Sequence, residues 1–555
     1  MTTVFLLIIG IVILLCIGLN NISARIGLPT LLLFLLLGMI FGNSGINKLE
    51  LEDYNFAKET CTVALIFIMF YGGFGTRWAT AKPVVGEASL LASVGVVTTA
   101  ALTGLFCHFA LGWSWVEGLL LGSVVGSTDA ASVFSILRSK KLGLKNNTAP
   151  LLEMESGSND PFSYMLTIVM LGILDGSATG GSIAIKLVAQ IVFGLGCGFG
   201  IAKLAELVLD HFHIMGKGFD SLFILSIALL SYAVPDIIGG NGYLSAYIVG
   251  IILGNREFAG KKALVNFFDG VTGLMQVLIF FLLGMLARVN MLHRVVLPAL
   301  AIFAFMLLVA RPVAVMSILT PFRKYPFRQQ ALVSFVGLRG AASIVFAILA
   351  VTDNPLLEVD LFNVVFCLVL ISISMQGSLI PWVAKKLDMT DASTDVMKTF
   401  NDYSEATEIQ FGRVDIIPGS TWDGKYVREL RLPKNMLLAM VLRDGRRYIP
   451  TGSMKLHTGD EAVVVTRPFG DSETYLVEKT VKKGGKRAGR KLNEVSGEGL
   501  VLLVKRNDQE FIPNGDTVLC EGDILVLLRE KEAKGVVPYD EKAEKDKAKS
   551  TEATN

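Results

Sequence analysis

Glu153-Met-Glu-Ser-Gly-Ser-Asn-Asp160 places three carboxylates at the edge of a long apolar segment. An Asp at the centre of a membrane helix costs roughly 2.5–3.5 kcal/mol on insertion scales, so such residues are kept where an ion or a proton must be bound. On a helix, Glu155, Ser156, Asn159 and Asp160 span an arc of roughly 140°. The stretch therefore predicts one aqueous cavity that these four side chains line.

The composition of the chain is that of a membrane protein. Of its residues 52% are apolar and only 18% are charged, and the mean hydropathy is +0.56. We expect about thirteen transmembrane helices of ~20 residues each. The first lacks the basic n-region and the cleavage site of a signal peptide, so we expect it to be retained. The candidate spans are 3–20, 28–45, 60–76, 84–111, 115–137, 149–175, 181–208, 219–235, 240–254, 264–287, 295–320, 328–351 and 360–384.

Lysine and arginine gather in alternate loops between these spans. The positive-inside rule makes the basic loops cytoplasmic, so we expect the N-terminus outside and the C-terminal part in the cytoplasm of a bacterial inner membrane. The basic set holds Arg25, Arg77, Lys82, Arg138, Lys140, Lys141, Lys145, Lys217, Arg256, Lys261, Lys262, Arg323, Lys324, Arg328, Lys385 and Lys386, and the other set holds Lys48, Lys58, Arg288 and Arg294.

Two spans contain a similar polar, glycine-containing interruption. The fifth holds Gly126-Ser-Thr-Asp-Ala-Ala-Ser132, and the twelfth holds Gly337-Leu-Arg-Gly-Ala-Ala-Ser343. Spans 1–6 and 8–13 form two six-helix blocks, and the single connecting span inverts the second block relative to the first. Interrupted helices at matching places of inverted repeats indicate the binding site of a transporter. Close packing of small residues explains the Ala-Ala-Ser of each copy but not its charged residue.

These charged residues and two nearby ones have predicted roles. Asp129 is expected to balance the dipole of a half-helix at the break. Arg339 is expected to be the counter-charge that keeps an empty acidic site from repelling itself. Arg311 is interpreted as an interhelical tie, with a place on the ion path as the alternative. Glu153 is interpreted as an acid in the first turn of its helix.

Five short motifs stand out within residues 1–390. They are Glu155-Ser-Gly-Ser-Asn-Asp160, Ser127-Thr-Asp129, Gly337-Leu-Arg-Gly340, Gly240-Asn-Gly-Tyr-Leu-Ser-Ala-Tyr-Ile-Val-Gly250 and Ala310-Arg-Pro312. Together they resemble the sodium/proton and potassium/proton antiporters of the NhaP/NHE type. The resemblance implies an all-α polytopic domain with broken crossing helices. Ala130 is a departure, because many relatives have Pro there, and it leaves the shape of that break open.

The resemblance also implies a set of site residues. In that family the Asp of the Asn-Asp pair carries the exchanged cation or proton, which assigns this role to Asp160. A monovalent cation would be held at Asp160, Thr128 and Ser156. The ion- and proton-binding set implied as a whole is Asp160, Asp129, Thr128, Ser156, Glu155 and Asn159, with Arg339 balancing the charge.

The chemistry of a buried carboxylate agrees with this role. A proton or a desolvated alkali cation can neutralise it, but not well both at once. Competition for Asp160 then forces exchange when the site opens to each side in turn, and oxygen ligands suit a hard cation. A related subgroup has a second Asp where this chain has Asn159, so the resemblance implies one-for-one, electroneutral exchange.

Other functional classes find little support in the sequence. It has no phosphate loop, Ser-His-Asp order or metalloprotease motif in a suitable context, so we expect neither an enzyme nor a cofactor. No basic-aromatic patch indicates nucleic acid. A ligand-gated potassium channel would need a Thr-Val-Gly-Tyr-Gly-like filter. A proton-coupled solute symporter would need a larger pocket with aromatic or basic contacts. The expected partners are K⁺ or Na⁺, protons and membrane lipid.

The C-terminal part contains an internal repeat. Residues 391–411 are polar and are expected to be a linker. Beyond them, Leu437–Gly452 is echoed by Leu500–Gly515, and Gly459-Asp460 returns as Gly522-Asp523, 63 positions later. We expect two small α+β units, 412–470 and 484–532, each with a hairpin and a closing strand. A disordered tail is expected at 533–555.

The first of these units resembles the C-terminal module of potassium-transport regulators, called RCK-C or TrkA-C. The resemblance is carried by Pro418-Gly-Ser420, Gly424-Lys425, Arg428-Glu-Leu-Arg-Leu-Pro433 and Ile449-Pro450. The second unit is a weaker match. In that family the module dimerises and often binds a small ligand, so the resemblance implies a homodimer and a small cytoplasmic ligand. A missing Gly-x-Gly-x-x-Gly argues against NAD or ATP control. The module slightly favours potassium over sodium, by analogy alone.

Overall fold

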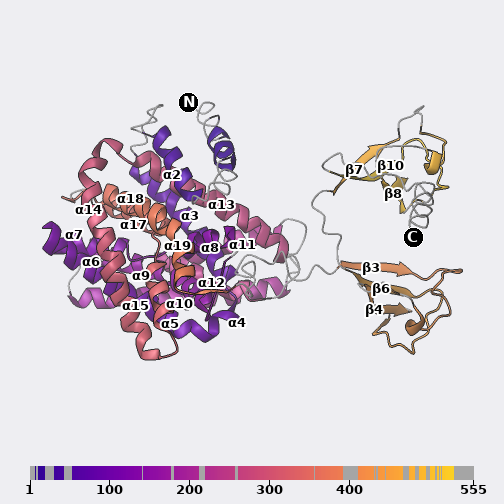
Figure 1. The fold of residues 1–555 in the computed structure, drawn as a ribbon, viewed down its shortest axis with the longest axis horizontal. Coiled ribbons are helices and arrows are strands. Elements are labelled where there is room, and N and C mark those ends of the chain that lie inside the picture. Colours follow the sequence, from indigo (N-terminus) through magenta and orange to yellow (C-terminus); the bar gives the residue numbers. More distant parts are fainter. Residues whose placement is uncertain are drawn as a thin grey trace, which may run out of the picture. The chain divides into compact units, whose positions relative to one another are not determined.

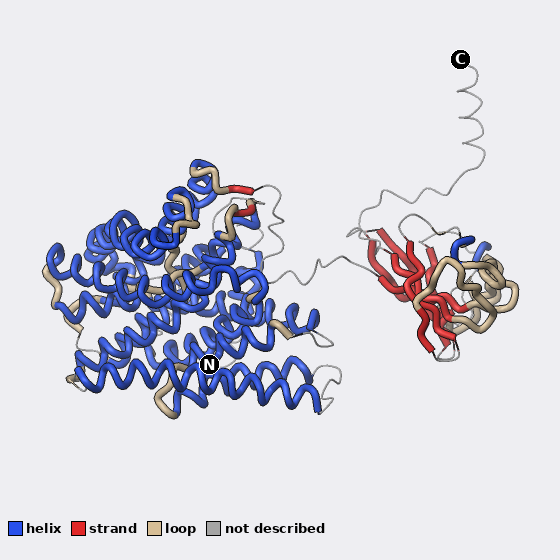
Figure 2. Tube along the Cα trace, turned by 90° about the horizontal axis from the view of Figure 1, so that it is seen from below, coloured by secondary structure: helices blue, strands red, loops and turns tan. Residues whose placement is uncertain are grey.

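The computed structural model divides the chain into two compact units, Met1–Ala406 and Thr407–Asn555. The first is helical and the second contains small sheets (Figures 1 and 2). The structure describes residues 7, 10–18, 30–42, 53–140, 142–176, 180–211, 219–256, 261–354, 357–391, 410–430, 432, 436–443, 446–466, 474–481, 487–494, 500–506, 509–511, 513 and 515–530.

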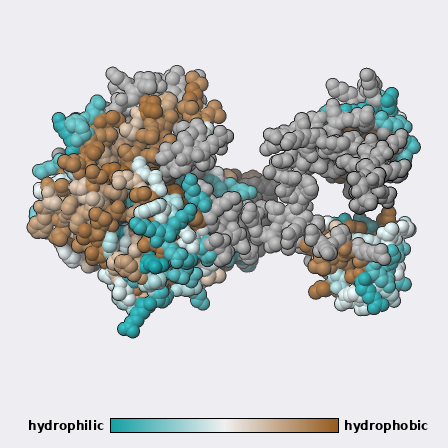
Figure 3. Space-filling view, viewed as in Figure 1, coloured by the Kyte–Doolittle hydropathy of each residue, from teal (hydrophilic) through white to brown (hydrophobic). Residues whose placement is uncertain are grey.

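The first unit is a mostly helical membrane domain. Among its described residues, seven helical segments are long and apolar enough to cross a membrane, and four shorter helices are apolar too. Hydrophobic side chains cover much of the face of this unit that Figure 3 shows. The α-helices are α2 (Thr30–Phe41), α3 (Tyr54–Gly75), α4 (Trp78–Ala81), α5 (Val85–Leu90), α6 (Val96–Leu111), α7 (Trp115–Val124), α8 (Ala130–Ser139), α9 (Thr148–Leu174), α10 (Gly180–His211), α11 (Phe219–Ile237), α12 (Gly242–Gly254), α13 (Lys261–Leu286), α14 (Leu292–Phe305), α15 (Arg311–Leu319), α16 (Phe327–Phe335), α17 (Ala341–Asp353), α18 (Leu361–Ile371) and α19 (Ser378–Lys386).

Several of these helices join into longer ones. Turns of π-helix connect α5 to α6, α14 to α15 and α18 to α19; they are η2 (Leu91–Gly95), η4 (Met306–Ala310) and η6 (Ser372–Gly377). A two-stranded sheet of β1 (Gly143–Leu144) and β2 (Thr390–Asp391) completes the unit. Each predicted span overlaps an observed helix, while the total of thirteen stays a prediction.

Both predicted helix interruptions are present. α7 ends at Val124 and α8 begins at Ala130, and α16 ends at Phe335 while α17 begins at Ala341. Glycine and small polar residues allow the backbone to leave the helix at these two places. Irregular backbone at membrane depth is tolerated only where protein or a water-filled cavity satisfies its polar groups. Protein groups or a cavity must therefore satisfy the polar backbone of residues 125–129 and 336–340.

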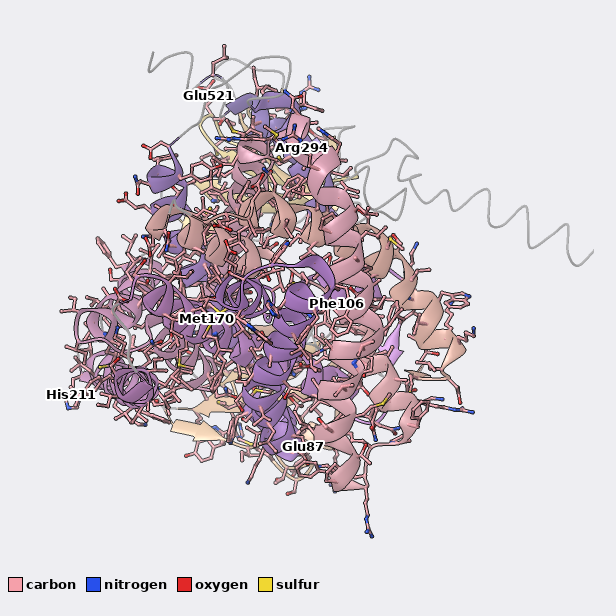
Figure 4. The ribbon with its side chains drawn as sticks, turned by 90° about the vertical axis from the view of Figure 1, so that its left-hand side faces the viewer. Glu87, Phe106, Met170, His211, Arg294 and Glu521 are labelled. Carbon is pink, nitrogen blue, oxygen red and sulfur yellow. The ribbon has the colours of Figure 1, made fainter. Side chains whose placement is uncertain are left out.

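Residues near the two predicted sets of loops lie at opposite ends of the helical unit. Figure 4 shows Glu87 and His211 toward one end of this unit and Arg294 at the opposite end. Glu87 follows the basic loop that contains Arg77 and Lys82, whereas Arg294 belongs to the sparsely charged set. The two sets of loops are thus separated at these positions. Which end faces the cytoplasm stays a prediction.

Glycine allows two pairs of helices to touch through their backbones. A Cβ on Gly250 or Gly254 of α12 would overlap a carbonyl oxygen of α3, and a Cβ on Gly38 of α2 would overlap the carbonyl of Phe281 in α13. Small residues drive helix association in membranes in this way. α2, α3, α12 and α13 therefore form one tightly packed group beside the interrupted helices.

The second unit contains two four-stranded antiparallel sheets with the same strand order. The first has the order β3-β6-β4-β5 and the second β7-β10-β8-β9. The predicted hairpins are β4–β5 and β8–β9. The strands are β3 (Gln410–Asp415), β4 (Met436–Arg443), β5 (Arg446–Tyr448), β6 (Glu461–Thr466), β7 (Thr474–Thr480), β8 (Leu500–Arg506), β9 (Gln509–Phe511) and β10 (Ile524–Glu530).

The repeat seen in the sequence extends to individual contacts. The Arg443 guanidinium donates to both carboxylate oxygens of Asp460, each at 2.7 Å. Arg506 does the same to Asp523, at 2.8 and 2.6 Å. In each unit the last arginine of β4 or β8 is thus bound to the aspartate of the Gly-Asp turn that precedes β6 or β10. The bidentate geometry makes these strong charge-assisted pairs.

The strands extend past the expected bounds of both small units, because β3 begins at Gln410, inside the expected linker, and β2 includes the first residue of that linker, Asp391. The second sheet takes in β7, which precedes residue 484, because β7 occupies in this sheet the place that β3 has in the first. The predicted linker at 391–411 lies outside the described residues except for 391, 410 and 411. The predicted tail at 533–555 lies outside them entirely.

Candidate ion-binding site

A cavity of about 320 Å³ lies among the interrupted helices, α9 and the group formed by α2, α3 and α13. Asp160 lies on its wall, with only 6% of its surface exposed. The predicted site residues that line it are Asp160, Asp129, Thr128 and Ser156, and the remaining charged or polar ones are Tyr71, Ser127, Ser135, Glu153, Asp269, Thr272 and Gln276.

The two interruptions meet at this cavity. The backbone N–H of Asp129 donates to the carbonyl of Leu338 at 2.8 Å. Gly340 lies so close that a Cβ added there would overlap the Asp129 side chain. Each break therefore satisfies part of the exposed backbone of the other, as irregular backbone in a membrane requires.

Asp160 is held by a residue of the first break. The Ser127 hydroxyl donates to Oδ1 of Asp160 at 2.5 Å. Pro161 follows within α9 and has no N–H, so it cannot donate to the carbonyl of Gly157 one turn earlier. Gly157 also lines the cavity. A carboxylate and a backbone carbonyl without its usual helical donor are therefore near each other on one helix.

The Gly240–Gly250 motif contacts the same place. Asn241 is fully buried, and its amide nitrogen donates to the carbonyl of Pro161 at 2.9 Å. Its side-chain oxygen accepts from the N–H of Leu244 at 2.9 Å and so caps α12. Asn241 thus fixes the start of α12 against the helix that carries Asp160.

Ser156 connects α9 to the first break. Its hydroxyl donates to the carbonyl of Thr128 at 2.5 Å and accepts from the N–H of Ala130 at 2.8 Å. A proline at position 130 would have no N–H for the second bond. Ala130, the departure from the resembling family, therefore allows a contact that proline would exclude.

Asn159 lies beside these groups but does not line the cavity. Its amide nitrogen donates to the Thr128 hydroxyl at 2.6 Å, and the residue is fully buried. Among the residues that the structure describes, its side-chain oxygen has no hydrogen-bond partner. Buried polar atoms are rarely left so. This oxygen is therefore a hydrogen-bond acceptor beside Thr128, in the first break.

Asp129 makes the contacts of a helix cap. Its carboxylate accepts from the backbone N–H of Ser132 at 3.2 Å and from the Ser132 hydroxyl. An acid at the N-terminus of α8 interacts favourably with the helix dipole. This is the structural role expected of Asp129, and the residue lines the cavity as well.

Arg339 and Glu155 have partners other than a cation site. The buried Arg339 guanidinium donates to the carbonyls of Gly126 and Ser127, at 3.1 and 2.7 Å, just beyond the C-terminal end of α7. Its described side-chain hydrogen bonds are therefore to carbonyls rather than to the acidic site.

Glu155 does not line the cavity. Its Oε1 lies 2.5 Å from Nη2 of Arg311, and both side chains are buried. Arg311 thus makes the expected interhelical tie.

The sequence motifs do not single out the part of the cavity wall that α13 forms. Asp269 of α13 accepts a hydrogen bond from the Tyr71 hydroxyl at 2.5 Å, and both residues line the cavity. On α13 the lining positions are 269, 272, 273 and 276, and on α9 they are 153, 156, 157 and 160. Both series have the spacing i, i+3, i+4 and i+7, which marks one face of a helix. That periodicity was the available signal for Asp269.

The charge of the cavity has one sign. Four carboxylates line it, those of Asp129, Glu153, Asp160 and Asp269, and no Lys, Arg or His occurs among its described lining residues. A cleft lined by charges of one sign concentrates ions of the other sign. Glu153, interpreted from the sequence as an acid in the first turn, lies in the second turn of α9 and contributes to this field. The arrangement is suited to small cations.

Comparisons with known proteins agree with this site and fold. Residues 11–386 match the family described as sodium/hydrogen exchanger, transmembrane, and residues 412–468 and 476–533 each match the TrkA-C domain. The K(+)/H(+) antiporter NhaP2 of Shewanella baltica is 33% identical over 464 residues, which are 80% of this chain and 77% of that protein. The K(+)/H(+) antiporter NhaP of Alkalimonas amylolytica is 32% identical, over 83% of this chain and 81% of that protein.

A solved structure has a similar fold. The sodium proton antiporter MjNhaP1 from Methanocaldococcus jannaschii matches with a TM-score of 0.59 and 24% identity, covering 68% of this chain and 97% of that chain. The fold and the paired broken helices define a multi-pass membrane protein of the secondary-transporter class. The chain belongs to the transmembrane sodium/hydrogen exchanger family, and it carries two TrkA-C domains.

Proposed function

We propose that this protein is an electroneutral monovalent cation/proton antiporter in which Asp160 binds the cation and the proton in turn. The observation that carries the proposal is the position of Asp160: buried, on the wall of a cavity with four carboxylates and no basic residue among its described lining. The carboxylates that line this cavity and the Ser127 hydroxyl on Asp160 supply oxygen ligands of the kind that hard cations prefer.

Competition for one carboxylate couples the two ions. When Asp160 faces one side, a cation displaces its proton; when it faces the other side, a proton displaces the cation. The Ser127 hydroxyl, the Ser156 hydroxyl and the carbonyl of Gly157 supply further oxygens near it. Asn159 in place of a second acid keeps the stoichiometry at one cation for one proton. No cofactor and no enzymatic step enter this scheme.

We propose potassium as the preferred cation. Two kinds of observation support it. The relatives at 32–33% identity are named K(+)/H(+) antiporters, whereas the Na(+)/H(+) antiporter 1 of Methanocaldococcus jannaschii is 27% identical. The TrkA-C domains resemble modules of potassium-transport regulators. We place the protein in the bacterial inner membrane as a homodimer, with the TrkA-C domains in the cytoplasm, where a small ligand regulates exchange.

Proton efflux from inverted vesicles tests the proposal. Potassium, and then sodium, is added with the membrane potential clamped. We expect one cation to dissipate the pH gradient at a rate that the clamp does not change. The Asp160→Asn variant should insert normally and show no exchange. Exchange at the wild-type rate in that variant, or cation flux that depends on the potential without proton movement, would contradict the assignment, the latter in favour of a channel.

A further inference from the structure

The segment that leads from the first unit to the second is paired with the loop between α8 and α9. β2 lies antiparallel to β1, with Leu144 opposite Thr390. Next to this pair, the backbone N–H of Lys145 donates to the carbonyl of Met389 at 2.9 Å. We call this pairing of the α8–α9 loop with residues 388–391 the strap.

Exposed side chains form ion pairs across the strap. The Lys145 ammonium donates to Oδ1 of Asp388 at 2.9 Å and to the Asp388 carbonyl at 3.1 Å. Arg328, in the first turn of α16, places Nη1 3.5 Å from the other carboxylate oxygen of Asp388. Exposed ion pairs contribute little stability, so their effect here is mainly to fix where the segment lies.

Apolar side chains of the strap pack against α8 and α9. Met389 and Leu144 are 2% and 7% exposed. They belong to one apolar cluster with Leu137 of α8 and with Leu151 and Leu152 of α9. Because interiors are closely packed, a displacement of Met389 is felt by both helices.

The elements that meet at the strap are those that carry the ion site. α8 begins directly after the first break, α9 carries Ser156 and Asp160, and α16 leads into the second break. The Gln329 amide of α16 also donates to the carbonyl of Asn146, in the same loop, at 3.0 Å. Three helices that bear site residues or breaks therefore share one attachment point, just before the chain continues into the second unit.

We propose that the strap is the mechanical connection through which the TrkA-C domains control exchange, by biasing the position of α8, α9 and α16. The proposal deepens the exchange function proposed above and rests on it. A regulatory domain can act at a distance only through an element whose arrangement both sites influence. The strap is such an element, because it is covalently continuous with the second unit and packed against the helices of the site.

The test separates the two units after folding. A site-specific protease sequence is inserted between Phe400 and Asn401 of the full chain, and the reconstituted protein is assayed before and after cleavage. We expect cleavage to change the apparent KM for potassium by at least about fivefold, the lower end of the usual range for allosteric coupling. In Lys145→Pro, which loses the N–H donor and the ammonium but keeps the carbonyl that accepts from Thr148, cleavage should change KM less than about twofold.

Matched variants separate the backbone bond from the charge. Lys145→Ala keeps the N–H and should retain most of the response to cleavage. Lys203→Ala removes an exposed ion pair to Glu206 within α10 and should respond like the wild type. Hydrogen exchange provides a readout in the unsubstituted protein: cleavage should speed amide exchange in residues 142–147 and leave α10 unchanged.

The outcomes are distinct. A Lys145→Pro protein that exchanges ions and responds fully to cleavage would overturn the proposal, as would a wild type whose KM and amide exchange are both indifferent to cleavage. Absence of exchange in the uncut wild type would instead contradict the proposed function itself.

Discussion

The backbone N–H of Asp129 donates a hydrogen bond to the carbonyl of Leu338, 209 positions later in the chain. This bond joins the interruption of one membrane helix to that of another. Because each break exposes polar backbone, the pairing satisfies a donor of one break and an acceptor of the other, as irregular backbone in a membrane requires. The geometry of the ion site therefore depends on both halves of the membrane domain.

Gly340→Ala should damage this junction. The new Cβ would overlap the side chain of Asp129, and overpacking of this kind costs about 1–3 kcal/mol. We expect a lower unfolding temperature in detergent and a reduced exchange rate in vesicles. Gly86→Ala is the control, because nothing lies within 4 Å of a Cβ there. Wild-type stability and exchange in Gly340→Ala would show that the two breaks are not tightly apposed.

The buried pair of Glu155 and Arg311 should behave as a structural unit. Arg311→Met leaves an unpaired carboxylate in the interior, and Glu155→Gln leaves an unpaired guanidinium; breaking a buried pair costs about 3–5 kcal/mol. The double variant should be less destabilised than the sum of the single variants. Thermal unfolding of all four proteins forms the double-mutant cycle. Additive losses would mean that the two side chains do not interact.

The sheets of the second unit should weaken in acid. Hydrogen bonds from Arg443 hold the pKa of Asp460 below its ordinary value, and those from Arg506 do the same for the pKa of Asp523. Because the folded-state pKa is the lower one, the stabilisation is present above the unfolded-state pKa of about 3.9 and is lost as pH falls through the folded value.

Hydrogen exchange of β4 and β6 in the first sheet and of β8 and β10 in the second, in the full chain and corrected for the intrinsic pH dependence, measures this effect. Protection should fall as the pH is lowered through about 4 and below. In Asp460→Asn the fall should be smaller in the first sheet and unchanged in the second. An equal acid response in both sheets of that variant would assign the effect to other carboxylates.

Removing residues 400–555 should change regulation and leave turnover intact. The membrane unit is compact and has its own apolar core, and residues 11–386 match the family model. We expect the truncated protein to exchange ions with an altered dependence on pH or on a regulatory ligand. Vesicle assays across a pH series provide the measurement. A truncated protein that folds but does not transport would contradict a purely regulatory role for the TrkA-C domains.

The sequence predicted the parts of the site that lie close together in the chain. Asp160 and Ser156 stand in one helical stretch, and the breaks near residues 126 and 337 are marked by glycine and small polar residues. Because local periodicity and composition determine these features, the helices, the breaks and the repeat of the small sheets could be expected without coordinates.

Contacts between distant elements could not be predicted in the same way. The role of Arg339 as a counter-charge stays a prediction, but its described guanidinium bonds are to carbonyls beyond the end of α7. Glu155 pairs with Arg311 instead of lining the cavity. Asp269 joins the cavity from a helix that the motifs do not include. Which side chains meet across helices depends on how the helices rotate and cross, which no single stretch encodes.

Pro161 has a consequence for the acid–base behaviour of the transporter. By withholding the helical donor from the carbonyl of Gly157, it leaves, on a residue that lines the cavity, a backbone oxygen that carries partial negative charge and takes up no proton in the working pH range. The partial charge of that carbonyl is the same in acid as in alkali. Proton uptake at the cavity is therefore left to its carboxylates, while the peptide oxygen is a group that side-chain replacement alone leaves in place.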